Sequence, residues 1–324
     1  MKAIINKNLI GACGLLILLL GAQVGKAQDQ TDSTPVTAPQ SKPKPKPVKN
    51  TFEGIWIIDN QTVFVPVKGT FEMDIMHRFG TLETGYEDFY GFFAPSNIRL
   101  GFSYVPVNKL MVGVSITKAN MTWEGYLKYS FFTQTKGRFP VSVSYYADMA
   151  IDTTGNENFY HKSDRLSYFH QILIARKIND RLSVQIAPSV SHANVVNGYF
   201  KTSGSVADST YTSELDGEME HNHFAIAVSA RYKIKPSMNI LFNYDQPLTK
   251  HQTNNPNPNL SLGIEFTTSA HSFQLFFTNF YSITPQRNNY TNKNNPISFV
   301  SFNDITFYPQ HFLIGFNITR LWNY

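Results

Sequence analysis

The chain has 324 residues, of which only 16% are charged and 14% are aromatic. Its single cysteine excludes a disulfide-rich scaffold and a Cys-ligated zinc or iron–sulfur centre. Many aromatic residues at low charge argue against disorder. No apolar run beyond the N-terminus is long enough for a membrane-spanning helix, which excludes a helical membrane bundle.

The formal net charge of +5 comes from the first fifty residues. From Thr51 onward the numbers of acidic and basic side chains are equal, so the body of the chain is formally neutral. No basic domain remains that would bind a phosphate backbone. We therefore expect no nucleic-acid partner.

Residues 1–27 are typical of a secretory signal peptide. Lys2 and Lys7 precede an apolar run over Leu9–Val24, and Ala27 supplies the small side chain of a cleavage site. Cys13 precedes the most apolar part of this run, unlike the cysteine of a lipoprotein processing site, so we expect it to be removed. The alternative, an uncleaved membrane anchor, is less consistent with so short a run. Export with cleavage near Ala27 is predicted.

Residues 28–50 form a predicted periplasmic linker in which lysine and proline alternate over Ser41–Pro47. Proline fixes φ and the like charges repel each other, so the segment should be an extended, solvated tail. The alternative is a contact with an acidic partner or a lipid surface.

From Thr51 to the end, apolar and polar residues alternate with the period of two that is typical of strands. The alternation predicts twelve strands, at about residues 71–79, 98–104, 110–116, 123–131, 141–151, 168–174, 182–190, 224–232, 238–244, 260–266, 273–281 and 312–318. Each predicted strand has about 10 residues, enough for a tilted strand to cross the hydrocarbon of a bilayer.

The connections between these strands alternate between short and long. Long ones are expected at 81–95, 153–164, 195–221, 248–258 and 283–310. Short turns on one rim and long loops on the other indicate an outer-membrane barrel. The apolar faces carry no charge in mid-strand, which favours a barrel over a soluble sandwich. We predict an all-β fold: residues 51–324 as a single up-and-down antiparallel transmembrane β-barrel of about 12 strands.

The last predicted strand ends the chain on an aromatic residue. Its outward face comprises Phe312, Ile314, Phe316, Ile318, Trp322 and Tyr324. Terminal strands of this kind are read by the machinery that inserts barrels into the outer membrane. That machinery and outer-membrane lipid are the expected partners.

The opposite parity of the strands places charged side chains in the lumen. The candidates are Glu72, Asp74, Arg78, Arg99, Glu124, Lys128, Asp148, Arg231, Asp245 and Glu265. Because the signs are mixed, we expect salt bridges that narrow the lumen rather than an ion-selective ring. Arg78 and Arg99 are expected to pair with neighbouring acids such as Glu72 and Asp74.

Two further groups were considered for chemistry. One is an acidic loop that runs into two histidines, which could bind a divalent cation: Glu214, Asp216, Glu218, Glu220, His221 and His223. Its spacing matches no known ion loop. The other is His170, which a membrane hydrolase could pair with a serine, but no Gly-x-Ser-x-Gly motif occurs. We therefore expect no catalytic residue, no metal and no cofactor.

Several short stretches resemble a family of exported Gram-negative β-barrels known only as barrel-forming domains of unknown function. They are His77–Gly80, Ile98–Gly101, Phe224–Ile226, Ala230–Lys233, Gly263–Glu265, His271–Leu275, Thr278–Asn279 and Gly315–Arg320. The family usually has glycines where this chain has Ser269 and Ala270. The resemblance covers about residues 51–324 and implies a fold and a location, but no activity.

A small channel or facilitator for a small polar solute is therefore the leading functional hypothesis. The alternative is a non-conducting structural or accessory barrel that binds an unknown protein partner through its loops or tail. A membrane-embedded hydrolase is third. On the leading hypothesis the protein is not an enzyme.

Overall fold

The computed structural model describes residues 46–49, 51–203, 212–301 and 304–323. The chain divides into two units, Met1–Lys44 and Pro45–Tyr324, and all described residues belong to the second. The predicted signal peptide, the first part of the predicted linker and Tyr324 lie outside the described residues.

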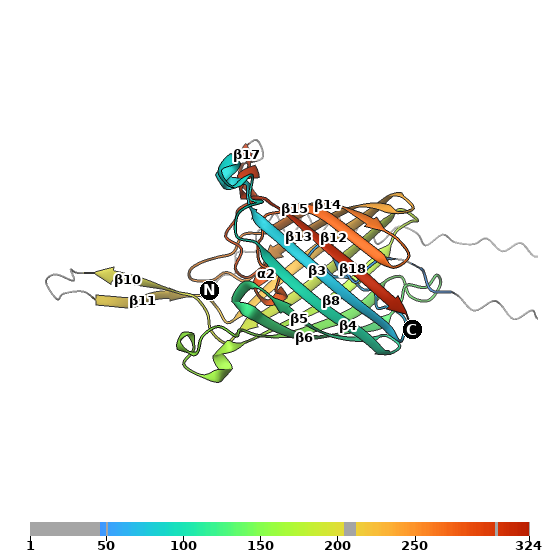
Figure 1. The fold of residues 1–324 in the computed structure, drawn as a ribbon, viewed down its shortest axis with the longest axis horizontal. Helices are drawn as coiled ribbons and strands as arrows, with labels where there is room; N and C mark the ends of the chain where they lie inside the picture. The colour runs from blue at the N-terminus through green and yellow to red at the C-terminus, as the bar shows by residue number, and fades with distance from the viewer. Residues whose placement is uncertain (1–45, 50, 204–211, 302–303, 324) are drawn as a thin grey trace, which may run out of the picture. The chain divides into compact units, whose positions relative to one another are not determined.

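The described chain forms a closed antiparallel barrel (Figure 1). Its wall consists of β3 (Thr70–Thr81), β4 (Asn97–Val107), β5 (Leu110–Thr117), β6 (Thr122–Phe132), β7 (Ser142–Ile151), β8 (Leu166–Lys177), β9 (Leu182–Ala193), β12 (Asn222–Lys235), β13 (Met238–Pro247), β14 (Asn259–Thr267), β15 (His271–Thr278) and β18 (Leu313–Asn323). Each wall strand pairs with the next one along the chain, and β18 closes the ring on β3. The predicted up-and-down barrel of about 12 strands is thus confirmed.

Side chains on the wall alternate between the interior and the outer surface. In β7, Ser142 and Ser144 are buried, whereas Val143 and Tyr145 lie on the outer face. This is the period of two that the sequence shows, because successive side chains of a strand point to opposite faces.

Three predicted strands extend past the wall strands, and the first of them begins one residue too early, at Val141 instead of Ser142. β15 ends at Thr278, so Tyr281 is not part of the wall. The side chain of Asn279 accepts a hydrogen bond from the Leu260 amide at 2.7 Å and donates to the Pro258 carbonyl at 2.8 Å, which ends the strand pairing. Phe312 precedes β18, and its ring lies 5.1 Å from that of Phe307.

Residues 51–65 lie inside the barrel, and we call this segment the plug. It contains a two-residue hairpin of β1 (Trp56–Ile57) and β2 (Asn60–Gln61). Its side chains and backbone contact residues of β3, β6, β7, β8, β9, β12, β13, β15 and β18. A segment that touches strands all around a closed ring must lie within it. The predicted boundary of the barrel at residue 51 therefore includes a segment that is not wall, since the wall begins at Thr70.

The chain reaches the plug from the rim of short turns. The Val48 amide donates a hydrogen bond to the Gln134 carbonyl at 2.8 Å, and Pro47 forms a β-bridge with Thr135 in the turn between β6 and β7. Lys177 donates to the carbonyl of Lys49 at 3.1 Å. The last residues of the predicted linker are thus attached to the barrel.

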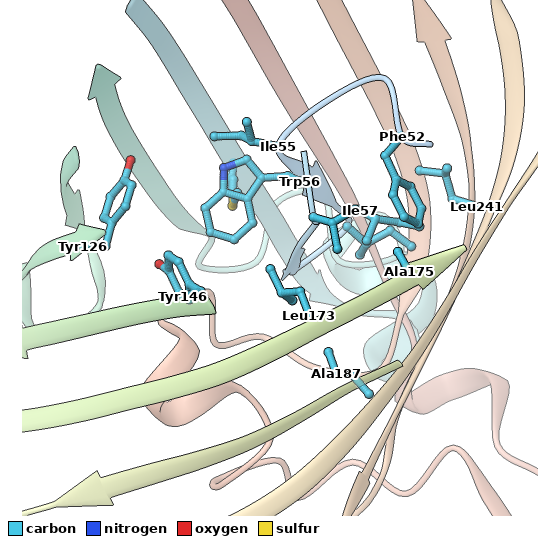
Figure 2. Packing of buried hydrophobic residues seen from close by; sticks show 14 of the residues in the cluster. Phe52, Ile55, Trp56, Ile57, Tyr126, Tyr146, Leu173, Ala175, Ala187 and Leu241 are labelled. Carbon is cyan, nitrogen blue, oxygen red and sulfur yellow. The ribbon is translucent and has the colours of Figure 1, made fainter. Parts of the chain in front are cut away.

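The plug supplies much of the apolar packing inside the barrel (Figure 2). Its buried side chains Phe52, Ile55, Trp56, Ile57, Ile58 and Val63 pack in one cluster with Tyr126, Tyr146, Leu173, Ala175, Ala187 and Leu241 of the wall. Burial of a large apolar side chain contributes about 1.5–3 kcal/mol. The plug therefore acts as a core that the wall alone lacks.

The long loops carry secondary structure of their own. They contain β10 (Gly198–Ser203) paired with β11 (Thr212–Glu218), β16 (Ile297–Ser301) paired with β17 (Asp304–Phe307), and α2 (Pro285–Asn288). The short 3-10 helices are η1 (Leu82–Asp88), η2 (Ala119–Met121), η3 (Asn156–Asn158), η4 (Lys162–Arg165) and η5 (Pro309–His311). None of the helices in the described ranges has the length and hydropathy needed to cross a bilayer.

Candidate functional site

The charged residues proposed for the lumen all lie on the inner side of the wall and are buried. They are Glu72, Asp74, Arg78, Arg99, Glu124, Lys128, Asp148, Arg231, Asp245 and Glu265, and none exposes more than 3% of its surface. Buried charges are costly unless they are paired or hydrogen-bonded. The partners of these side chains therefore determine whether the interior is closed or can hold a solute.

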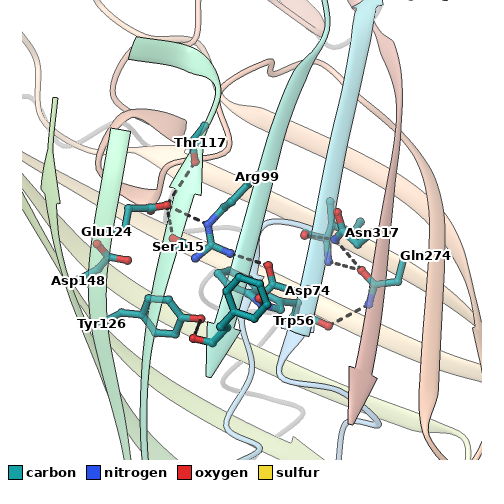
Figure 3. A network of polar contacts seen from close by, with 12 residues as sticks. Trp56, Asp74, Arg99, Ser115, Thr117, Glu124, Tyr126, Asp148, Gln274 and Asn317 are labelled. Atoms are coloured by element: carbon teal, nitrogen blue, oxygen red, sulfur yellow. Dashed lines mark hydrogen bonds and ion pairs between the residues drawn. The ribbon is translucent and has the colours of Figure 1, made fainter. Parts of the chain in front are cut away.

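Arg99 is the centre of the main ion-pair network (Figure 3). Its Nη1 lies 2.8 Å from Asp74 Oδ2 and its Nε lies 2.9 Å from Glu124 Oε2. Ser115 adds a hydrogen bond to the same Glu124 oxygen at 2.6 Å. One cation thus joins acids from β3 and β6 across the two strands between them.

The plug is attached to this network. Trp56 Nε1 donates to Asp74 Oδ1 at 3.2 Å, and the guanidinium of Arg99 lies 4.9 Å from the centre of the Trp56 ring. A cation over an indole face is attracted by the quadrupole of the ring. The ion pairs of the wall therefore also hold the first strand of the plug.

Arg78 does not join an acid, contrary to the expected pairing with Glu72 and Asp74. Among the described residues it makes no ion pair; its Nη1 donates to Asn317 Oδ1 at 3.0 Å, and its guanidinium lies 4.5 Å from the ring centre of Phe276. Gly315 faces Arg78 on β18. A Cβ there would lie 2.9 Å from Arg78 Cδ, so the glycine leaves the space that the side chain occupies.

Lys128 contacts the plug instead of an acid. Its Nζ donates to Gln61 Oε1 at 2.8 Å and to the Thr62 carbonyl at 3.2 Å. Neither carboxylate oxygen of Glu72 has a hydrogen-bond partner in the described part of the chain. Glu72 is therefore a buried carboxylate without a hydrogen bond from any described residue, and the positive charges of Lys128 and Arg99 stabilise it.

On β15 and β18, which lie next to β3 in the ring, amide side chains clamp the tip of the plug. Gln274 accepts a hydrogen bond from the Ile58 amide at 3.0 Å and donates to the Trp56 carbonyl at 2.9 Å. Asn317 donates to the Ile58 carbonyl at 2.5 Å. Ile58 has a φ of 61°, a strained conformation for a β-branched residue. The wall thus holds the hairpin in a conformation that the isolated segment would rarely adopt.

A second set of contacts comes from β7 and β9, and β12, β13 and β14 separate β9 from β15 in the ring. Gln185 accepts from the Val63 amide at 3.0 Å and donates to the Gln61 carbonyl at 2.7 Å, while Ser144 donates to the Val63 carbonyl at 2.9 Å. These side chains take the place of a neighbouring strand for the backbone of the plug. Buried backbone groups require such partners.

The turn of the plug contacts β13 through polar side chains. Asn60 Nδ2 donates to Asp245 at 2.9 Å and to Asn243 at 3.1 Å, and Asn243 in turn donates to Asp59 at 3.0 Å. Burial raises the pKa of Asp59 to about 6, while the guanidinium of Arg78 opposes the rise. The docked plug thus favours the protonated form of this carboxyl group.

A second segment closes the lumen nearer the long-loop rim. After β15 the chain turns inward, so that Phe280 and Ile283 are buried and α2 lies inside the mouth. Gln286 donates to Asp148 at 2.6 Å, and Arg287 forms an ion pair of 3.0 Å with Asp152. We call residues 280–292 the α2 loop.

The plug and the α2 loop meet at a small, partly open cavity of about 10 Å³, room for one water molecule. It is lined by Trp56, Asp59, Asn60, Gln61, Tyr146, Phe169, Gln171, Asp245, Pro285, Asn288 and Asn289. Seven of the eleven lining residues are Asp, Asn or Gln. Protein therefore fills the lumen at two heights along the barrel, at the plug and at the α2 loop.

His170 and His221 belong to the two groups for which the sequence disfavoured a chemical role, and each contacts a polar atom of a neighbouring strand. His170 Nδ1 lies 2.7 Å from the hydroxyl of Tyr145 on the outer face, and His221 contacts the carbonyl of Ala193. Within the described ranges, no three or more His, Cys, Asp or Glu side chains are grouped so that they could hold a metal ion.

The residues of the predicted insertion signal are divided between surfaces. Ile314, Phe316 and Ile318 lie on the outer face of β18, and the Trp322 ring lies 5.5 Å from that of Phe71. Phe312 is buried beneath Phe307 instead. Reading of this strand by an insertion machinery stays a prediction.

The plug was missed by sequence reasoning, although one signal pointed to it. Ile55, Trp56, Ile57 and Ile58 are four consecutive apolar residues. A wall strand alternates, so an unbroken apolar run indicates a segment that is buried on every side.

A family model described as "Membrane bound beta barrel domain (DUF5777)" matches residues 52–322. No curated protein matches the chain. Among solved structures, the NanC porin is 8% identical with a TM-score of 0.42, covering 78% of this chain and 99% of its own. An outer membrane channel from Pseudomonas putida F1 is 10% identical with a TM-score of 0.44, covering 80% and 97%.

The KdgM porin is 9% identical with a TM-score of 0.40, covering 78% of this chain and 99% of its own. Likeness at this level says nothing about a solute. The family match extends from the plug into the last strand, and covers every wall strand except the final residue of β18. The chain therefore belongs to this family of membrane-bound β-barrel domains.

Proposed function

We propose that this protein is an outer-membrane channel for a small polar solute, and that its own plug closes it in the state described here. One observation carries the proposal: the wall holds the plug backbone through polar side chains around the whole ring. If the plug leaves, water can hydrate those side chains, so an open lumen is not prohibitively costly. A lumen built only to be filled needs no such polar lining.

The lining also limits the class of solute. Six of the ten buried wall charges are carboxylates and four are cations, so the field in an open lumen is weakly negative. Neutral polar solutes and small cations fit such a lining better than anions do. Amide side chains such as Gln185 and Gln274 can donate to and accept from hydroxyl groups.

The test is a change that expels the plug and leaves the wall intact. Ile57 is fully buried within the plug, so Ile57→Asp should prevent docking because an ionised carboxylate is costly there. Val67 lies in the link to β3 and is exposed, which makes Val67→Asp the matched control. Planar-bilayer recordings of both full-length variants and the wild type should show steady conductance only where Ile57→Asp is present.

The filled lumen itself favours a second candidate, a non-conducting accessory barrel. The same recordings separate the two functions. The α2 loop must be released as well, so Ile57→Asp is also combined with Gln286→Ala and Arg287→Ala. If both Ile57→Asp proteins fold, as judged by heat-modifiable gel mobility, and expose the plug to protease but do not conduct, the channel is excluded. The accessory barrel would then be the better account.

A further inference from the structure

The loop between β3 and β4 exposes an unusual number of aromatic side chains. We call residues 82–93 the aromatic loop. Within eight residues it presents Tyr86, Phe89, Tyr90, Phe92 and Phe93, and Tyr86 and Phe93 expose 80% and 81% of their surface. Contiguous apolar surface of this kind marks an interaction site on a protein.

The exposure is imposed by a defined backbone. Phe89 and Tyr90 have φ values of 52° and 58°, in the left-handed region that residues with large side chains rarely adopt. The turn is held by hydrogen bonds from the Tyr90 amide to the Gly85 carbonyl at 2.6 Å and from the Gly91 amide to Asp88 Oδ1 at 2.8 Å. The chain thus uses a strained turn to direct its aromatic rings outward, and strain of this sort is concentrated at functional positions.

The aromatic loop is continuous with the outer surface of the barrel. The ring of Phe92 lies 4.7 Å from that of Phe79 on β3, and Phe79 lies 6.1 Å from Phe316 on β18. Phe316 also lines a recess of about 260 Å³ in the outer wall, together with Phe273 and Leu275 of β15. An apolar track therefore leads from the membrane-facing wall to the loop.

The direction of the loop differs from that of the β10–β11 hairpin. In Figure 1 the aromatic loop, the cyan coil beside the label β17, projects sideways from the barrel wall, whereas β10 and β11 extend along the barrel axis. The hairpin carries Lys201, Glu214, Asp216 and Glu218, as a segment in water does. A sideways projection at a strand end brings the loop toward the plane of the membrane surface.

We propose that the aromatic loop inserts into the membrane leaflet at the long-loop rim, with its rings at the boundary between headgroups and acyl chains. Aromatic side chains favour this boundary. Glu83 and Glu87 in the same loop need water, so they limit the depth of insertion. The partner is a lipid surface, and the proposal is independent of whether the lumen conducts.

The test compares two phenylalanines in different loops. Phe93→Cys and Phe200→Cys, the latter exposed on β10, are each made in a Cys13→Ser background and labelled with a nitroxide. The full-length proteins are reconstituted into phosphatidylethanolamine–phosphatidylglycerol vesicles. Collision of each label with oxygen, which concentrates in lipid, and with a water-soluble nickel complex is then measured by electron paramagnetic resonance.

The label at position 93 should collide at least severalfold more with oxygen than with the nickel complex, and the label at position 200 should show the reverse. Equal access of nickel to both labels would overturn the proposal. So would protection of position 93 from both reagents, since that would place a second copy of the chain over the loop. Tyr86→Cys provides a second position at which the same contrast must appear.

Discussion

The plug and the α2 loop both fill the lumen, but the wall holds them in different ways. The plug is fixed through its backbone, by side chains from strands all around the ring. The α2 loop is fixed mainly through its own side chains. Gln286 and Arg287 reach Asp148 and Asp152 at one end of β7, Asn288 and Asn292 bond to Asn259 at the start of β14, and Tyr290 donates to the Glu220 carbonyl. The plug is thus part of the core of the closed state, whereas the α2 loop is attached by separate side-chain contacts to several points near the long-loop rim.

The largest expected effect contrasts Arg99, the wall cation that lies against Trp56 of the plug, with Arg287 of the α2 loop. Arg99→Ala leaves Asp74 and Glu124 buried without their cation and should cost about 3–5 kcal/mol. Arg287→Ala removes a partly exposed ion pair and should cost about 1 kcal/mol or less. Urea titrations of heat-modifiable gel mobility give both values. Equal costs would mean that the two regions are held alike.

A smaller effect is expected at the amide clamp. Gln274→Ala leaves the Ile58 amide and the Trp56 carbonyl without partners, at about 1–3 kcal/mol, so the plug should open about tenfold or more as often. Hydrogen–deuterium exchange of the peptide that contains Ile58 measures this opening. Gln246→Ala is the control, because its side chain bonds only within β13. Unchanged exchange in Gln274→Ala would show that apolar packing alone holds the plug.

The smallest expected effect is the response to pH. Burial raises the pKa of Asp59 to about 6, whereas in the released plug the carboxyl group has its ordinary, lower pKa. Between these two values the docked plug holds a proton on Asp59 and the released plug does not. Docking is therefore favoured at low pH and weakens as the pH rises through about 6. Between pH 5 and pH 7.5 the loss is about 1 kcal/mol.

Exchange of the plug, corrected for the intrinsic rate, should thus rise about tenfold from pH 5 to pH 7.5. Asp59→Asn removes the titrating group and should abolish the change. A pH response that persists in Asp59→Asn would assign it to another group. The α2 loop is the internal comparison, because its hydrogen exchange should not depend on the protonation of Asp59.

The wall strands were predictable from the sequence because the direction of each side chain depends only on its position along the strand. Alternation in β7, where Ser142 and Ser144 face inward and Val143 and Tyr145 outward, follows from the pleat of a strand. The errors at Tyr281 and Phe312 occurred at strand ends, where the side chain of Asn279 and the ring of Phe307 compete with strand pairing. Local pattern carries no information about such partners.

The sequence by itself thus determined the twelve strands, the faces of the wall and the inward direction of its charges, because each depends on neighbours one or two residues apart. Only the tertiary structure decided what fills the lumen. Partners such as Ile58 and Gln274, or Asn60 and Asp245, are separated by most of the chain, and no periodicity relates them. They meet only because the barrel closes and brings β13, β15 and β18 around a segment that precedes the first strand.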